Sequence, residues 1–213
     1  MADRAPAPGR LALVQAFENT VDLERGEEEL LSPEALAGWL ARRGLLGPGE
    51  RLSQADLERA LAAREAVRAL LLANGGAPAD PEAADALDRL GAAARLRVRF
   101  DADGHARLVP DATGVDGALG ELLAIIDGAM RDGTWTRLKA CREDTCRWAY
   151  YDHSKNRSGT WCTMAACGNR AKARSYRQRK GHSSRGARED GASAPAGSGG
   201  GAAVPADPAD QRR

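Results

Sequence analysis

Apolar side chains recur every three or four residues along most of the first part of the chain, which predicts a helical domain. The first helix is expected within residues 11–25, where one face is formed by Leu13, Ala16, Phe17, Thr20 and Val21. Three further helices begin at polar residues suited to cap them, namely Ser32, Ser53 and Asp80. The last helix covers residues 115–131, and its core face is formed by Leu119, Leu122, Leu123, Ile126 and Met130.

Within this helical region the apolar period changes to two along one short segment. Val98 and Phe100 alternate with arginines, Asp103-Gly104 forms a turn, and residues 106–109 can supply the return strand. We therefore expect one β-hairpin among the helices.

Four cysteines follow the helical region, and the chain has no others. They are Cys141, Cys146, Cys162 and Cys167, in the order C-x4-C, fifteen residues, C-x4-C. Two close pairs can place four thiolates around one tetrahedral ion, and four thiolates leave no open coordination position. We therefore expect one structural zinc ion and no catalytic metal. Two alternatives stay open: four unrelated reduced cysteines, or a redox role, although dithiol oxidoreductases typically use C-x-x-C.

The segment around the cysteines is predicted to form a hairpin and a helix. Residues 148–151 favour a strand, residues 155–159 favour a polar turn, and Trp161 is placed on the return strand. The helix is expected to begin around Ala165 or Ala166. The Gly-, Ala- and Pro-rich composition that follows cannot bury enough apolar surface to fold, and predicts a disordered tail.

The expected fold class is therefore α+β, mainly α. A helical N-terminal domain with one β-hairpin is followed by a small zinc finger, built of a β-hairpin plus a helix, and by the tail. The expected bounds are 1–133, 134–180 and 181–213.

Charge is distributed unevenly, although the whole chain carries a formal net charge of +1. Residues 135–180 hold twelve Lys or Arg and three Asp or Glu, a net charge of +9, and residues 181–213 are neutral overall. Residues 1–134 therefore carry a net charge of −8. An acidic body joined to a strongly basic finger is typical of proteins in which one part binds nucleic acid.

The cysteine segment resembles the CGNR zinc finger over about residues 138–179. The resemblance rests on the cysteine spacing, on Trp161 before the third cysteine, on Met164, and on the C-G-N-R sequence that starts at Cys167. Proteins with this finger usually carry an N-terminal ABATE domain. The resemblance implies a bacterial stress-induced transcription regulator.

The start of the chain resembles the opening of the ABATE domain at Leu11-Ala12-Leu13 and Asn19-Thr20-Val21. It departs from the pattern L-x-L-D-F-x-N-T, because extra residues are present and no aspartate precedes Phe17.

Basic residues of the last helix are candidates for nucleic-acid contact. Arg170, Arg174 and Arg177 form one stripe, and Lys172, Arg179 and Lys180 lie roughly opposite. A helix that is basic on two sides cannot bury both stripes, so one could lie in a groove while the other meets phosphates. The polar turn adds Lys155 and Arg157. The alternative is a solvated basic helix end.

Two neighbours of the cysteines are expected to support the finger. Asn169 is suited either to cap a helix or to bond the thiolates, with nucleic-acid contact as the alternative. Trp161 and Trp148 are expected to pack over the zinc site, and stacking on bases is the alternative for Trp148.

These features together predict a zinc-dependent regulator that binds duplex DNA. The acidic N-terminal domain is expected to sense a small molecule or to form a homodimer. Two other functions stay open, an RNA-binding or translation-associated protein and a thiol-based redox sensor. The sequence has none of the common phosphate-loop, metalloprotease or nucleophile-elbow motifs, so we do not expect an enzyme. Without a long apolar stretch or a secretory signal, we expect no membrane contact and a location in the bacterial cytoplasm.

Overall fold

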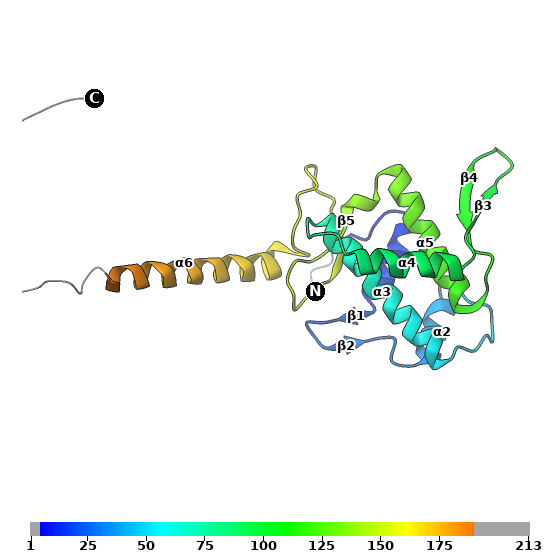
Figure 1. The fold of residues 1–213 in the computed structure, drawn as a ribbon, viewed down its shortest axis with the longest axis horizontal. Helices are drawn as coiled ribbons and strands as arrows, with labels where there is room; N and C mark the ends of the chain where they lie inside the picture. Colours follow the sequence, from blue (N-terminus) through cyan, green and yellow to red (C-terminus); the bar gives the residue numbers. More distant parts are fainter. Residues whose placement is uncertain (1–4, 190–213) are drawn as a thin grey trace, which may run out of the picture. The chain divides into compact units, whose positions relative to one another are not determined.

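The structure is a computed structural model that describes residues 5–189, with side chains up to residue 179 (Figure 1). The side chain of Lys180 and residues 190–213, which hold most of the predicted tail, lie outside the described residues. The predicted domain bounds remain predictions.

Five helices build the N-terminal part: α1 (Leu11–Glu18), α2 (Pro33–Ala41), α3 (Gln54–Asn74), α4 (Pro81–Ala93) and α5 (Gly114–Asp132). The predicted helix starts are confirmed by their caps. The Ser32 hydroxyl accepts a hydrogen bond from the Ala35 backbone, and Ser53 and Asp56 form a reciprocal capping box. The Asp80 carboxylate accepts hydrogen bonds from the next turn in the same way. Local sequence therefore determines where these helices begin.

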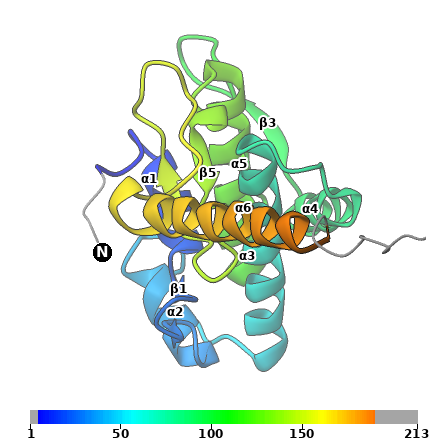
Figure 2. The same cartoon turned by 90° about the vertical axis from the view of Figure 1, so that its left-hand side faces the viewer.

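The first helix is shorter than predicted, because it ends at Glu18 and not near residue 25. The next residues form a small hairpin, in which β1 (Val21–Asp22) pairs with β2 (Glu27–Glu28). The Asp22 carboxylate accepts hydrogen bonds from the backbone of Glu24 and Arg25, at 3.0 and 3.1 Å. This side-chain turn forms the loop of the hairpin, four residues after the helix has ended. The hairpin lies beside the start of α2 (Figures 1 and 2).

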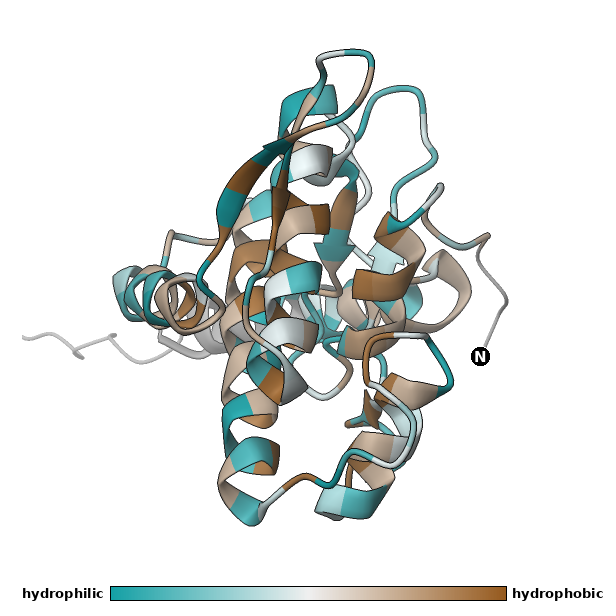
Figure 3. Ribbon diagram, turned by 90° about the vertical axis from the view of Figure 1, so that its right-hand side faces the viewer, coloured by the Kyte–Doolittle hydropathy of each residue, from teal (hydrophilic) through white to brown (hydrophobic). Residues whose placement is uncertain are grey.

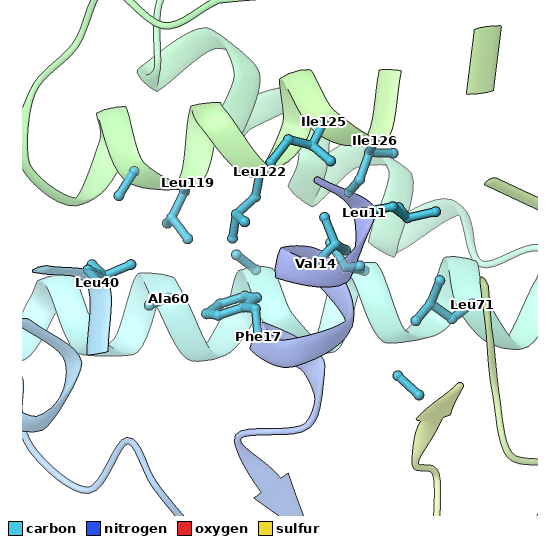
Figure 4. Packing of buried hydrophobic residues seen from close by; sticks show 14 of the residues in the cluster. Leu11, Val14, Phe17, Leu40, Ala60, Leu71, Leu119, Leu122, Ile125 and Ile126 are labelled. Carbon is cyan, nitrogen blue, oxygen red and sulfur yellow. The ribbon is translucent and has the colours of Figure 1, made fainter. Parts of the chain in front are cut away.

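The core is formed where α1 lies between α3 and α5 (Figure 4). Phe17 is buried and contacts Trp39 of α2, with ring centroids 5.6 Å apart. The face of α5 that enters the core was predicted correctly except at its end. Met130 is 49% exposed, and Ala129 is buried in its place.

The predicted hairpin within the helical part is confirmed. Strand β3 (Arg97–Phe100) pairs with β4 (Ala106–Val109), and Figure 3 shows apolar and polar bands along it. Its apolar side chains do not enter the core, since Val98 is 55% and Phe100 is 73% exposed.

The finger begins with a 3-10 turn (Trp135–Arg137) and strand β5 (Leu138–Ala140), which pairs with β6 (Ala149–Tyr151). This hairpin encloses the first cysteine pair, whereas the sequence predicts a hairpin between the two pairs. The prediction that Trp161 lies on a return strand is therefore wrong, because Trp161 lies in an irregular segment. The physical reason is the short C-x4-C spacing, which folds into a tight turn and brings β6 back onto β5.

A π-helical turn (Met164–Gly168) and helix α6 (Asn169–Glu189) follow the second cysteine pair. The turn begins one residue before the predicted helix start, and α6 ends at Glu189, beyond the predicted Lys180. The chain divides into two units, Met1–Lys172 and Ala173–Arg213, so α6 begins in the first and continues in the second. Among the described residues, no helix has the length and apolar character needed to cross a bilayer.

Strands β5 and β6 share the core of the helical part. The side chains of Leu138, Ala140, Ala149 and Tyr151 belong to the same buried cluster as the helix residues. The first unit is therefore built as one body, in which the finger's strands are packed against α3 and α1.

Candidate metal centre and basic surface

The structure brings all four predicted cysteine ligands together. All are buried, and their sulfur atoms lie within 4.8 Å of one another. The Sγ atoms of Cys146 and Cys162 are 3.6 Å apart, and those of Cys162 and Cys167 are 3.5 Å apart. Zinc–sulfur bonds of about 2.3 Å in a tetrahedron place neighbouring sulfurs about 3.8 Å apart. The four cysteines therefore form the metal site of a zinc finger and fit one structural zinc ion.

Backbone hydrogen bonds position the first cysteine pair. The Cys141 N–H donates to the Trp148 carbonyl at 3.0 Å, which continues the β5–β6 ladder past Ala140. Within the turn, the Glu143 carbonyl accepts from the Cys146 N–H at 2.8 Å, and Arg147 has a positive φ of 51°. The ladder and the tight turn together aim both sulfurs at one centre.

The second pair is held by the π-helical turn. The Thr163 hydroxyl caps that turn by accepting from the Ala166 N–H at 3.2 Å. Gly168, the glycine of C-G-N-R, is closely approached by two side chains, so a larger residue there would have to displace the end of Met164. A Cβ there would lie 2.7 Å from Met164 Sδ and 3.3 Å from Trp161 Cδ1. The close packing of these two side chains accounts for the glycine next to the last ligand.

The close approach of the sulfurs moves their pKa values in opposite directions. Hydrogen bonds from the Cys146 and Cys162 thiols lower the pKa of Cys141 to about 2. The contact with Cys141 in turn raises the pKa of Cys146 and Cys162. Four thiolates at this separation repel one another, and a divalent ion at their centre removes that penalty.

Two tryptophans cover the cysteine cluster. Trp148 and Trp161 are partly buried and pack against the four cysteines and Tyr150. This is the packing role expected for both. An apolar cover lowers the local dielectric around the zinc–thiolate group and limits access of water.

Arg170 occupies a different position from the one expected of a nucleic-acid contact. Its guanidinium donates two hydrogen bonds to the Glu24 carboxylate, at 2.6 and 3.1 Å, and a third to Cys167 Sγ at 3.0 Å. The hydrogen bond from Arg170 holds the pKa of Glu24 below its usual value. Arg170 thus connects the turn between β1 and β2 to a zinc ligand.

The basic turn at residues 155–159 is stabilised by a buried ion pair that bonds its backbone. Lys139 Nζ lies 3.0 Å from Asp152 Oδ2 and also donates to the carbonyls of Arg157 and Gly159. Burial opposes ionisation of Asp152, but hydrogen bonds from Ser154 and Lys139 keep its pKa below the usual value. The turn is therefore structured, and the side chains of Lys155 and Arg157 are exposed on it.

The remaining predicted residues lie on α6. The side chains of Lys172, Arg174, Arg177 and Arg179 are exposed. Asn169 donates from Nδ2 to the Ala165 carbonyl at 3.2 Å, which joins the π-helical turn to the first turn of α6. This bond is neither an N-cap hydrogen bond nor a bond to a thiolate, so the role predicted for Asn169 stays a prediction.

Sequence reasoning missed the residues that attach the finger to the helices. The Asn19 amide bonds both backbone groups of Ala149, at 2.9 and 2.8 Å. Arg68 donates to the carbonyl of Arg147 at 2.9 Å and to that of Glu18 at 2.7 Å. The Asn74 amide bonds two carbonyls of the segment that leads into β5. The only signal in the sequence is the Asn19-Thr20 pair, which carries part of the resemblance to the ABATE domain.

These features define a class of protein: a helical domain whose hydrophobic core includes the strands of a four-cysteine zinc finger. The chain belongs to the ABATE family, described as "Putative stress-induced transcription regulator", whose model matches residues 11–132. The CGNR zinc finger matches residues 137–180. Both matches confirm the resemblance drawn from the sequence, and the family description is that of a regulator and not of an enzyme. No curated protein matches the chain.

Proposed function

We propose that this protein is a zinc-dependent transcription regulator that binds duplex DNA and acts in the bacterial cytoplasm. The observation that carries the proposal is that exposed basic residues follow the last metal ligand closely in the sequence. Helix α6 begins two residues after the ligand Cys167 and carries the exposed side chains Lys172, Arg174, Arg177 and Arg179. A zinc ion bound by Cys167 would order the residues at which this basic helix begins. Basic residues that follow an ordered metal site are suited to contact a phosphate backbone.

The proposed contact set combines this helix with the basic turn. It consists of Lys155, Arg157, Lys172, Arg174, Arg177, Arg179 and Lys180. We leave Arg170 out of the set because its guanidinium already bonds Glu24 and Cys167. Contacts from this set to phosphates would supply affinity, and arginines that reach guanine edges would supply sequence preference.

The N-terminal domain is proposed to regulate this binding, through a small molecule or a second copy of the chain. A groove of about 410 Å³ supports the first alternative. It lies along α5, between the start of α1 and β4, with apolar Leu108 and Ile125 in its lining and Arg10 and Arg107 beside them. Glu121 and Asp132 also line the groove, and Arg10 is paired with Glu121 at 2.6 Å. The lining would therefore suit a small molecule that has both apolar and polar groups.

Binding of a labelled duplex to the full-length, zinc-loaded chain tests the proposal. Replacing Arg174 and Arg177 by Ala should weaken binding several-fold and reduce the salt slope by about 0.9 for each phosphate that is no longer neutralised. The matched control is the double variant Arg89→Ala with Arg99→Ala, which removes an equal charge from two exposed positions outside the finger. If the α6 double variant keeps the affinity and the slope of the unmodified protein, α6 is not the binding surface. Preference for RNA over duplex of the same sequence would move the function to the RNA-binding class.

A further inference from the structure

Arg170 lies between two anionic groups that come from distant parts of the sequence. One is Cys167 Sγ, three residues away, and the other is Glu24, which lies 146 residues earlier in the chain. The carboxylate is engaged through both oxygens by two different guanidinium nitrogens. Such bidentate pairs fix the plane of the guanidinium, which a single charge contact does not.

Glu24 is itself presented by a structured turn. The Asp22 side chain is buried and accepts hydrogen bonds from the backbone of Glu24 and of Arg25. Gly26 has the positive φ of 67° that the turn needs before β2 begins. The carboxylate that meets Arg170 is therefore held in place by the N-terminal domain.

The contact on the other side matters to the metal. A zinc ion with four thiolates carries a formal charge of −2, and a hydrogen bond from a guanidinium to one sulfur offsets part of it. Groups that bond the ligands of a metal in this way typically contribute a factor of about 10 to 100 to metal affinity. Arg170 is placed to make that contribution to Cys167.

We propose that Arg170 is a positioning residue of the zinc site and that Glu24 holds it there, so that the β1–β2 hairpin of the N-terminal domain controls how tightly the finger retains zinc. A movement of this hairpin would then first alter the hydrogen bond from Arg170 to Cys167, the ligand two residues before α6 begins. The proposal concerns zinc retention and does not require nucleic acid.

The proposed relay, in which Glu24 positions Arg170 and Arg170 bonds Cys167, is tested by measuring zinc affinity. The full-length protein competes for zinc with a chromogenic chelator. Arg170→Ala should lower the apparent zinc affinity about 10- to 100-fold. Glu24→Gln keeps the shape of the side chain but weakens the pair, and should lower the affinity about 3- to 10-fold. The matched control is Glu27→Gln, an equal charge change on the same hairpin at an exposed residue that pairs with Arg25 instead.

The double variant decides whether the two residues act together. If Glu24 acts through Arg170, then Glu24→Gln combined with Arg170→Ala should bind zinc no more weakly than Arg170→Ala alone. Additive losses would overturn the relay, as would a Glu24→Gln variant that matches the Glu27→Gln control. Full zinc affinity in Arg170→Ala would overturn the positioning role itself. Because the assay contains no DNA, none of these results depends on the proposed regulator function.

Discussion

Removing the Asn19 side chain should detach strand β6 from helix α1. The Asn19 amide donates from Nδ2 to the Ala149 carbonyl at 2.9 Å and accepts from the Ala149 N–H at 2.8 Å. It thus pairs with the free edge of β6 as a neighbouring strand would. Ala149 is fully buried, so Asn19→Ala leaves its N–H without that partner, while the carbonyl keeps only the hydrogen bond from Gln15 at 3.3 Å.

The expected cost follows from these groups. Leaving the buried Ala149 N–H without its partner costs about 1–3 kcal/mol, and the bond lost at the carbonyl costs about 1 kcal/mol. The free energy of unfolding should therefore fall by about 2–4 kcal/mol. Urea denaturation of the zinc-loaded protein, followed by tryptophan fluorescence, measures this loss. Asn19→Asp keeps the acceptor and loses the donor, and should fall between Asn19→Ala and the unmodified protein unless burial of the new charge adds a further penalty.

The matched control is Asn156→Ala, which removes the same side chain from an exposed position on the basic turn. It should change stability by less than about 0.5 kcal/mol. If Asn19→Ala costs no more than this control, the Asn19 amide does not hold the finger to the helices, and the energy assigned to its two hydrogen bonds is wrong.

Three further predictions concern buried groups near the finger. Gly168→Ala places a Cβ against Met164 and Trp161, and should cost about 1–3 kcal/mol in urea denaturation, with Ser158→Ala as an exposed control. Lys139→Met leaves Asp152 buried and unpaired, and should cost about 3–5 kcal/mol, whereas the accompanying change Asp152→Asn should recover part of that loss. Burial raises the pKa of Glu18 to about 8 despite the nearby Arg68, so the folded protein holds a proton that the unfolded chain releases near pH 4.5. Its contribution to stability is thus present at low pH and is lost as pH rises towards 8, and Glu18→Gln should flatten that decline; equal pH profiles for the two proteins would refute a neutral Glu18.

Helix starts and metal ligands could be predicted because both are local. The capping box at Ser53 and Asp56 and the cysteine spacing each lie within a few residues of sequence. The end of α1 could not be predicted in the same way. Its apolar spacing continues to Val21, but Asn19 bonds Ala149 and the Thr20 carbonyl accepts from the Glu29 N–H, so the backbone leaves the helix after Glu18.

The other missed features are pairings between segments that the sequence does not show. The sequence favours a finger hairpin between the cysteine pairs because nothing in it shows that β5 pairs with β6. The partners of Arg170 were missed because Glu24 lies 146 residues away, and a basic helix offers no sign that one of its arginines is already engaged. Charge counts describe a surface, but only tertiary structure shows which charges remain available on it.

The central claim is that one zinc ion, bound by the four cysteines, holds the finger in the form that binds DNA. The most direct test measures zinc content and duplex binding on the same full-length sample, before chelation, after chelation and after zinc is restored. The account predicts about one zinc per chain, loss of binding with the metal, and recovery of both together. A sample that holds less than about half an equivalent of zinc, or that binds DNA equally well after chelation, would contradict it.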